Sequence, residues 1–187
     1  MLSPETYSVT ALREAVAAGW SPKYVFFWGH TGRPGAPVGK ECFSQWYPAA
    51  FTLEGIHYET AEHYMMWSKA RLFGDEEAAR RVLAARHPGE AKELGRTVRG
   101  FDEEAWERRR FDVVVAGSVG KFSQNPALRA FLLDTHPRVL VEASPRDAIW
   151  GIGLAEKDEG ARDPDQWRGL NLLGFALMKA RALLQAG

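Results

Sequence analysis

The polar residue with the clearest chemical potential is Glu62, near the start of the run Thr-Ala-Glu-His-Tyr-Met-Met-Trp-Ser-Lys-Ala-Arg-Leu-Phe over 60–73. Apolar residues occupy nearly every face of a helix formed by this run, and such a helix is usually buried. Burial favours the protonated acid, whereas the positive end of the helix dipole favours the carboxylate. A carboxylate held in a dry pocket by these opposing effects is suited to stabilising a developing cation. The alternative is an ordinary first-turn glutamate that only complements the helix dipole.

A second candidate region is the run Glu-Ala-Ser-Pro-Arg-Asp-Ala-Ile-Trp-Gly-Ile-Gly-Leu over 142–154, which follows an apolar strand pattern. Gly151 and Gly153 allow a ligand to approach the backbone closely and leave Trp150 room to stack on a flat ring. Asp147 adds a carboxylate to the same loop, and loops that follow strands often carry functional residues. The alternative is a hairpin in which Trp150 is core and Asp147 makes an Asx-turn.

Three further polar features could contact phosphate or ribose hydroxyls. Lys121 and Asn125 bound the run Lys-Phe-Ser-Gln-Asn between two predicted helices, and they supply ammonium and amide donors. The alternative is a polar connection between the helices in which Asn125 caps the helix that begins at Pro126. Ser44 and Trp46 belong to the run Phe-Ser-Gln-Trp-Tyr, in which aromatics enclose a polar pair. Arg96 is a third possible anion contact, with an exposed salt bridge as the alternative.

Composition limits the classes of function. Lys plus Arg and Asp plus Glu balance at 24 each, which leaves no global basic field for a nucleic-acid backbone, although local patches remain possible. The single cysteine, Cys42, rules out an internal disulfide framework and favours a reducing compartment. His57 and His63 are close in sequence and the other three histidines are scattered, but no two lie at ligand spacing on one helix, so a metal site is not expected. Residues 1–10 do not resemble a signal peptide, and no apolar run is long enough to span a membrane. We therefore expect a cytoplasmic protein.

The hydropathy pattern predicts an α+β fold that is mainly helical, with a few short strands in a single domain over residues 21–187. A short helix ended by Gly19 precedes this domain, and residues 1–20 are expected to form an N-terminal helical appendage. Thr60 and Asp102 are the expected caps of two of the helices. The expected helices lie over 9–18, 60–73, 75–86, 90–95, 102–118, 126–134 and 171–184, and the expected strands over 24–28, 38–43, 138–142 and 149–154.

Taken in order along the chain, these residues resemble the YbiA-like family, whose domains are also called NADAR domains. Each motif is weak alone, but the ordered series is specific and covers about 24–184. One departure is the loop Gly-Arg-Pro-Gly-Ala-Pro over 32–37, which is longer than the resemblance predicts and bears on substrate choice. The matching motifs are Phe26-Phe27-Trp28, Phe43–Trp46, Tyr58–Met65 with Lys69-Ala70, Gly95-Arg96, Trp106, Lys121–Asn125, Glu142–Gly153 and Gly169–Gly174 with Leu177-Met178.

The resemblance implies a metal-independent N-glycosidase that needs no cofactor. It implies two groups of activity: hydrolysis of an N-glycosidic bond in early phosphorylated intermediates of riboflavin biosynthesis, and removal of ADP-ribose from modified guanine bases in nucleic acid. It also implies that the catalytic carboxylate is Glu62, that Trp106 and Trp150 contact the substrate, and that an acid near Trp150, which we match to Asp147, takes part.

These residue types suit the reaction. Breaking a C1′–N bond develops positive charge on the ribose, as in glycoside hydrolysis, and Glu62 would stabilise that charge. Trp106 and Trp150 would stack the departing base. Asp147 would orient water or a ribose hydroxyl. The remaining predicted substrate contacts are Lys121, Asn125, Arg96, Trp46 and Ser44.

Two other classes of function remain open. A non-catalytic module that binds ADP-ribose or another nucleotide would use the same tryptophan, lysine and asparagine side chains. A helical interaction protein would use all seven tryptophans as core, and replacing Trp150 with alanine would then unfold it. The sequence does not choose between the two substrate groups, and the expected partners are a phosphoribosyl or ADP-ribosyl small molecule or an ADP-ribosylated nucleic acid, with no membrane.

Overall fold

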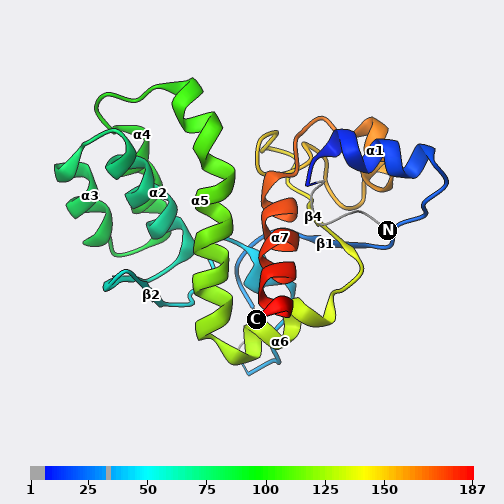
Figure 1. Cartoon of the computed structure of the whole chain (residues 1–187), viewed down its shortest axis with the longest axis horizontal. Coiled ribbons are helices and arrows are strands. Elements are labelled where there is room, and N and C mark those ends of the chain that lie inside the picture. Colours follow the sequence, from blue (N-terminus) through cyan, green and yellow to red (C-terminus); the bar gives the residue numbers. More distant parts are fainter. Residues whose placement is uncertain (1–6, 33–34) are drawn as a thin grey trace. The chain divides into compact units, whose positions relative to one another are not determined.

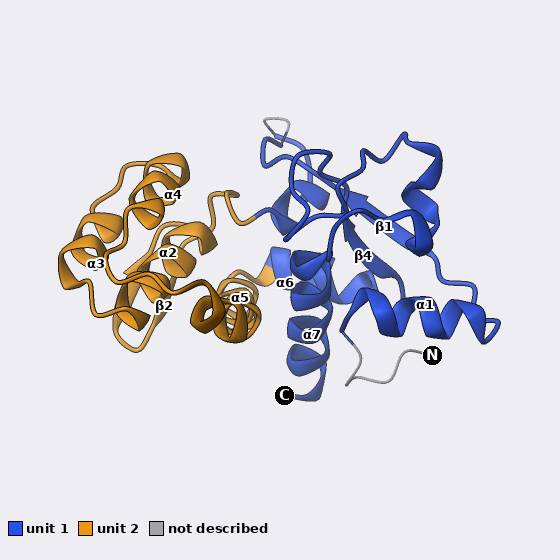
Figure 2. Ribbon diagram, turned by 90° about the horizontal axis from the view of Figure 1, so that it is seen from above, with its two compact units in different colours: residues 1–44, 127–187 blue, residues 45–126 orange. Residues whose placement is uncertain are grey.

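The computed structural model describes residues 7–32 and 35–187, and within them the chain forms seven α-helices, three short 3-10 helices and four short strands (Figure 1). This confirms the mainly helical α+β fold. The chain divides into two compact units, residues 1–44 with 127–187 and residues 45–126 (Figure 2). We call them unit 1 and unit 2 and describe each by itself.

Unit 1 is built on a pair of parallel strands, β1 (Tyr24–Phe27) and β4 (Val139–Glu142), in which Tyr24 pairs with Val139 and Phe27 with Glu142. Val139, Leu140 and Val141 are fully buried, as expected of a β-branched and leucine run covered on both faces. Helix α7 (Leu172–Ala186) packs against β4 and buries Phe175 and Leu177 completely. The core of unit 1 therefore lies between this strand pair and α7.

Helix α1 (Val9–Ala17) also belongs to unit 1. The Ser8 side chain accepts a hydrogen bond from the Ala11 amide at its start. Arg13 donates from Nε to the carbonyl oxygen of Pro164 at 2.9 Å, in the 3-10 helix η3 (Pro164–Gln166). The expected helix over 9–18 is thus confirmed, whereas the boundary of an appendage at residue 20 stays a prediction. Residues 1–6, which belong to that appendage, and residues 33–34, which belong to the loop over 32–37, lie outside the described residues.

Unit 2 gathers three helices around α2 (Ala61–Leu72), which contacts all of them: α3 (Glu76–Leu83), α4 (Pro88–Arg96) and α5 (Glu103–Gln124). Gly95 and Gly117 allow two of these close approaches, because an added Cβ would lie 2.0 Å from the Met66 sulfur and 2.6 Å from the Tyr64 ring, respectively. A hairpin of β2 (Phe51–Leu53) and β3 (Ile56–Tyr58) completes unit 2 and contacts α5. Helix α6 (Pro126–Asp134) begins where unit 2 ends.

Two expected strands did not form, and one hairpin was not predicted. Residues 38–43 do not form a strand; Lys40–Phe43 form a 3-10 helix, η1, and the Glu41 carboxylate accepts the Gly39 amide at its start. The segment over 149–154 contains bends rather than a strand. The hairpin over 51–58 was not predicted, because its turn is Glu54-Gly55 and a glutamate rarely takes the positive φ of 51° found here. The third 3-10 helix is η2 (Glu159–Arg162).

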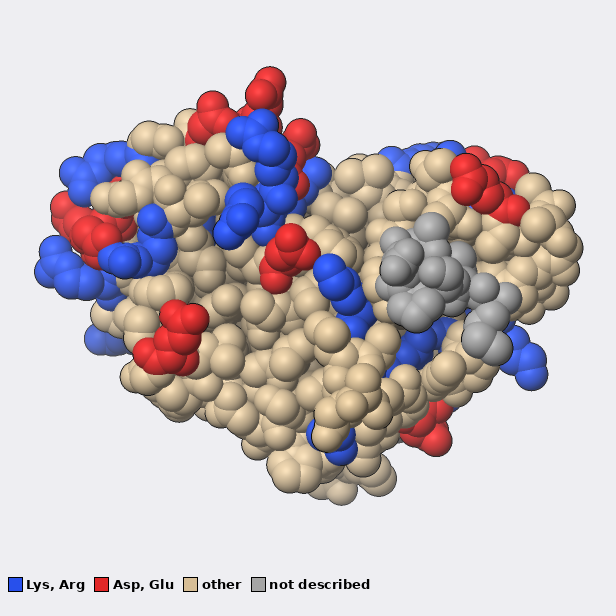
Figure 3. Space-filling view, in the orientation of Figure 1, with Lys and Arg blue, Asp and Glu red and all other residues tan. Residues whose placement is uncertain are grey.

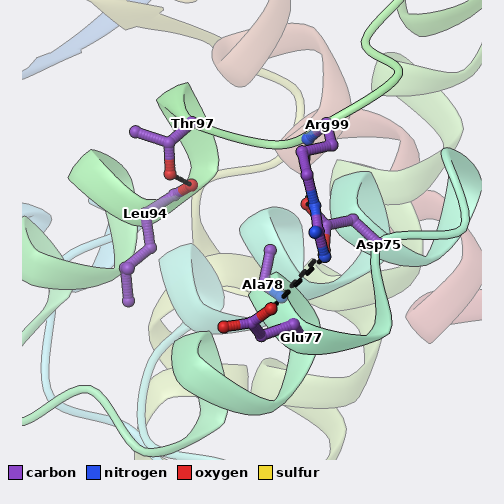
Figure 4. Close-up of polar contacts among 6 residues, drawn as sticks. All are labelled: Asp75, Glu77, Ala78, Leu94, Thr97 and Arg99. Carbon is purple, nitrogen blue, oxygen red and sulfur yellow. Dashed lines mark hydrogen bonds and ion pairs between the residues drawn. The ribbon is translucent and has the colours of Figure 1, made fainter.

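A buried carboxylate joins two helix junctions of unit 2 (Figure 4). Asp75 caps α3 by accepting the Ala78 amide at 3.1 Å, and it also accepts the backbone amide of Arg99 at 2.8 Å. The Arg99 guanidinium lies 2.8 Å from the same carboxylate and 3.4 Å from that of Glu77. These donors hold the pKa of Asp75 well below its usual range. Asp75 thereby ties the α2–α3 junction to the segment before α5.

Replacing Asp75 with alanine is expected to lower the melting temperature markedly, because the cap and both Arg99 contacts are lost together. Asp75→Asn keeps an acceptor for the Ala78 amide and should lie between wild type and the alanine variant. Thermal unfolding followed by circular dichroism measures both. Glu77→Gln is the matched control, since its carboxylate is exposed and contributes little. Equal melting temperatures for wild type and Asp75→Ala would contradict this account.

On the face drawn in Figure 3, acidic and basic side chains are interspersed among the described residues, in line with the balanced charge of the chain. None of the described helices has the length and apolar character that crossing a membrane requires.

Candidate functional site

Glu62 lies in the first turn of α2 and is 3% exposed. Thr60 is the N-cap of this helix, as predicted, and its hydroxyl oxygen accepts the His63 amide. The Glu62 amide itself donates to the Gln45 carbonyl oxygen at 3.0 Å, so the first residue of unit 2 is joined to the start of α2. The helix start therefore holds a buried carboxyl group at the end where the dipole favours negative charge. This is the burial that the apolar helix pattern predicted.

The neighbouring His63 is buried and anchored on both ring nitrogens. Its Nδ1 lies 2.8 Å from the Thr60 hydroxyl, and its Nε2 lies 3.2 Å from the Ala85 carbonyl oxygen. A carbonyl oxygen can only accept, so Nε2 carries the proton and Nδ1 accepts from Thr60. Burial lowers the pKa of His63, against the opposing effects of the Ala85 hydrogen bond and of Glu59 and Glu90. The imidazole is thus a neutral support for the helix start that carries Glu62.

This support predicts an acid sensitivity. Because the pKa of His63 is lowered in the folded state, the unfolded chain binds the proton more readily below about pH 6.5, and stability falls as the pH drops through that value. His63→Gln should therefore lose less melting temperature than wild type between pH 7.5 and pH 5.5. His57→Gln is the control, since His57 is exposed beside Glu59. Acid destabilisation of equal size in wild type and His63→Gln would disprove the assignment.

Trp106 lies on α5 and is 7% exposed. The Lys69 ammonium of α2 lies 5.9 Å from the centre of the Trp106 ring and 4.0 Å from that of Phe101. Burial lowers the pKa of Lys69, and Glu103 opposes this effect. Lys69 follows Glu62 by two helical turns, a spacing that places both on the same side of α2. Lys69 is not among the site residues predicted from the sequence, although this spacing from Glu62 is a signal for it.

The expectation that the helix ends at 118 and leaves residues 121–125 as a connection was wrong: α5 continues to Gln124, and Lys121 and Asn125 occupy its last turn and C-cap. Lys121 is 1% exposed, and its ammonium lies 5.5 Å from the centre of the Tyr47 ring. Asn125 donates from Nδ2 to the carbonyl oxygens of Ala50 and Lys121 at 3.1 and 2.7 Å. These two hydrogen bonds close the C-terminal end of α5; they are not the cap of the following helix that was considered as the alternative, and the contact of Asn125 with phosphate stays a prediction. Lys121 is a buried cation among aromatic rings.

The other predicted contacts of this kind are more peripheral. Arg96 is exposed and its guanidinium bonds to Glu93 at 2.5 Å, which is the salt bridge considered as the alternative. Trp46 is half-buried, with the Lys92 ammonium 5.9 Å from its ring centre. Ser44 is half-buried and follows η1, where its amide donates to the Glu41 carbonyl oxygen. Nothing in these contacts assigns the three residues to a ligand, and their roles stay predictions.

Asp147 and Trp150 lie in unit 1, on the loop that follows β4, and both are half-buried. The Asp147 Oδ1 accepts the amides of Ile149 and Trp150 at 2.8 and 2.7 Å. This is the Asx-turn weighed in the sequence analysis. The turn does not place the indole in the core, because part of Trp150 remains open to solvent. Asp147 thus fixes the backbone that carries Trp150.

The candidate residues therefore fall into two sets. Within unit 2, the helix that carries Glu62 packs against the helix that carries Trp106 and Lys121. Among the described residues, no group of three or more His, Cys, Asp or Glu side chains is arranged to hold a metal ion. Unit 2 holds Glu62, Trp106, Lys121, Asn125, Arg96 and Trp46, and unit 1 holds Ser44, Asp147 and Trp150.

Comparison with known proteins extends this description. N-glycosidase R617 of Acanthamoeba polyphaga mimivirus is 43% identical over 164 residues, which are 85% of this chain and 95% of that protein. The chloroplastic riboflavin biosynthesis protein PYRR of Zea mays is 36% identical over 132 residues, which are 67% of this chain and 19% of that longer protein.

A solved structure is similar as well. The NMR structure of the Escherichia coli protein YbiA matches with a TM-score of 0.67 at 25% identity, over 89% of this chain and 88% of that one. The NADAR domain matches residues 26–185. That match takes in every candidate residue above, from Ser44 to Trp150, and the chain belongs to the NADAR domain family.

Proposed function

We propose that this chain is an N-glycosidase that hydrolyses the bond between ribose C1′ and a base nitrogen. The observation that carries the proposal is the buried carboxyl group of Glu62 at the start of α2, on a helix that packs against the one bearing Trp106. The names of the mimiviral and bacterial relatives, both N-glycosidases, support the same reaction.

The reaction follows from the chemistry of Glu62. As the C1′–N bond breaks, its electron pair leaves with the base and positive charge develops on the ribose ring. A carboxylate that is kept out of water stabilises this charge more strongly than an exposed one, because the local dielectric constant is low. Water then adds its oxygen to C1′, and a proton passes to the base nitrogen. No oxidant, reductant or cofactor is consumed.

The aromatic and cationic residues supply binding. The indole of Trp106 offers a flat surface to a base, and stacking of this kind contributes about 1–3 kcal/mol per base. Lys121 and Lys69 lie on the same two helices and provide positive charge for a phosphate group. We assign Trp150 to contact with the substrate and Asp147 to orientation of water or of a ribose hydroxyl. These roles make a phosphorylated riboside a better ligand than the free nucleoside.

The proposed substrate is a phosphorylated riboside intermediate of riboflavin biosynthesis, and an ADP-ribosylated guanine is the second candidate. The name of the maize relative favours the first. Both substrates carry an N-glycosidic bond and at least one phosphate. The base-stacking and cationic residues assigned in unit 2 suit both of them equally. We place the reaction in the cytoplasm, where a lone thiol stays reduced.

The test offers the purified protein both substrates and follows the products by mass spectrometry. Release of free base with ribose 5-phosphate supports the riboflavin intermediate, and release of ADP-ribose supports the modified guanine. Isothermal titration with ADP-ribose runs in parallel. Micromolar binding without any release of base from either substrate would refute the N-glycosidase proposal and support a nucleotide-binding module.

A further inference from the structure

Asn171, at the start of α7, has an unusual set of contacts. It is fully buried and takes the left-handed conformation, with φ of 51°. Its side-chain amide donates from Nδ2 to the Leu140 carbonyl oxygen at 2.9 Å, and its Oδ1 accepts the Glu142 amide at 2.9 Å. One side chain therefore pairs with a carbonyl oxygen and an amide of β4, two residues apart.

These two groups lie on the edge of β4 that faces away from β1. In the β1–β4 pair, the amides of Val139 and Ala143 donate to carbonyl oxygens on the side of β1. Strand geometry directs the groups of Leu140 and Glu142 to the opposite edge. The side-chain amide of Asn171 occupies that edge and makes the hydrogen bonds that the backbone of a third strand would make. The Ile152 amide continues the pattern by donating to the Glu142 carbonyl oxygen at 3.0 Å.

The backbone at the start of α7 holds the loop from its other side. The amides of Asn171, Leu172 and Leu173 donate to the carbonyl oxygens of 151, 149 and 150 at 3.0, 3.2 and 3.1 Å. The first amides of a helix have no partner within the helix, and here the loop supplies their acceptors. The Trp150 amide donates to Asp147, so the backbone of Trp150 is fixed at both its amide and its carbonyl group.

We propose that Asn171 is a positioning residue that sets the place of Asp147 and Trp150 for substrate. It does so because it bonds to both β4 and the loop: its side chain pairs with Leu140 and Glu142, and its backbone amide donates to Gly151. The position needs a left-handed residue with a donor and an acceptor on a short side chain, which asparagine supplies. Its surroundings are tight, since a Cβ added at Gly174 would lie 2.6 Å from the Asn171 amide. This proposal rests on the proposed function for its catalytic consequence.

The experiment replaces Asn171 with glycine and with aspartate. Glycine keeps the left-handed backbone and removes both side-chain hydrogen bonds, whereas aspartate keeps an acceptor for Glu142 and loses the donor to Leu140. Hydrogen exchange should show faster exchange at the amides of 149–153 in both variants. We expect kcat/KM to fall by about tenfold to a hundredfold, mainly through KM, because the stacking ring is misplaced.

Thr135→Val is the matched control in the same unit. Thr135 is buried, donates to the Leu132 carbonyl oxygen and accepts from Arg181, and neither bond involves the loop over 149–153. It should lower the melting temperature without changing exchange at 149–153 or KM. A double-mutant cycle adds Trp150→Ala: if Asn171 acts through Trp150, the loss caused by Asn171→Gly should shrink sharply in that background.

Unchanged exchange at 149–153 together with wild-type kcat/KM would overturn the proposal, as would a loss of equal size in the Trp150→Ala background. If Asn171→Gly fails to fold, the aspartate variant is judged by the same two readouts. If wild type cleaves neither substrate, the proposed function fails, and hydrogen exchange alone then decides whether Asn171 holds the loop.

Discussion

Glu62→Gln is expected to lower kcat by about a hundredfold or more while the protein stays folded. Glutamine fills the same volume but carries no charge, so the developing ribose cation loses its stabilising partner. KM should change little, because the substrate is uncharged at C1′ in the ground state and the lost interaction belongs to the transition state. Initial rates of base release, measured over a range of substrate concentrations, give both parameters.

The control for this experiment is Glu59→Gln. Glu59 lies just before the Thr60 cap, is exposed and pairs with His57, so its loss should leave kcat unchanged. Circular dichroism and melting temperature establish that Glu62→Gln keeps its helices. A folded Glu62→Gln protein that turns over at the wild-type rate would remove this carboxyl group from the mechanism.

Trp150→Ala is expected to lower kcat/KM by about 5- to 150-fold and to leave a folded protein. The magnitude corresponds to the loss of about 1–3 kcal/mol of stacking on a base. The fold should survive because Trp150 is only half-buried and its backbone is held by Asp147 and Leu173. Trp150→Phe keeps a flat ring and should recover part of the activity. Steady-state kinetics with thermal unfolding measures both effects.

Trp167→Ala provides the contrast. Trp167 is 5% exposed and its indole donates to the Ala161 carbonyl oxygen at 2.9 Å, so it is a core residue of the same unit. Its loss should destabilise the protein by about 3–5 kcal/mol, as is typical of a large buried ring. If Trp150→Ala unfolds the protein to the same degree, the tryptophans serve packing alone and the view of a helical interaction protein is correct.

The features that local sequence determines were predicted well. Thr60 and Asp102 cap the helices expected of them, because their side-chain oxygens accept an amide of the first turn that has no partner within the helix. The helix over 126–134 has the predicted bounds, since proline marks its first residue. Burial of Glu62 followed from the apolar faces of its helix. These signals act within a few residues, so the sequence displays them directly.

The features that depend on distant contacts were not predicted. The β2–β3 hairpin lacks a favourable turn sequence and is held from outside, by a Gln124 side chain that pairs with both the amide and the carbonyl oxygen of Thr52. Asn171 pairs with residues that lie about thirty positions earlier in the chain. Lys69 approaches Trp106 only because α2 packs on α5. No local pattern contains such pairings.

The parallel pair β1–β4 has a consequence for the order of events during synthesis. β1 leaves the ribosome early, yet its partner strand is made only after the whole of residues 45–126 has emerged. The helices of that intervening segment mainly contact one another, so they can form before β4 has been made and can pair with β1. Until then the apolar run from Tyr24 to Phe27 is an open strand edge on a nascent chain, the kind of surface that chaperones shield.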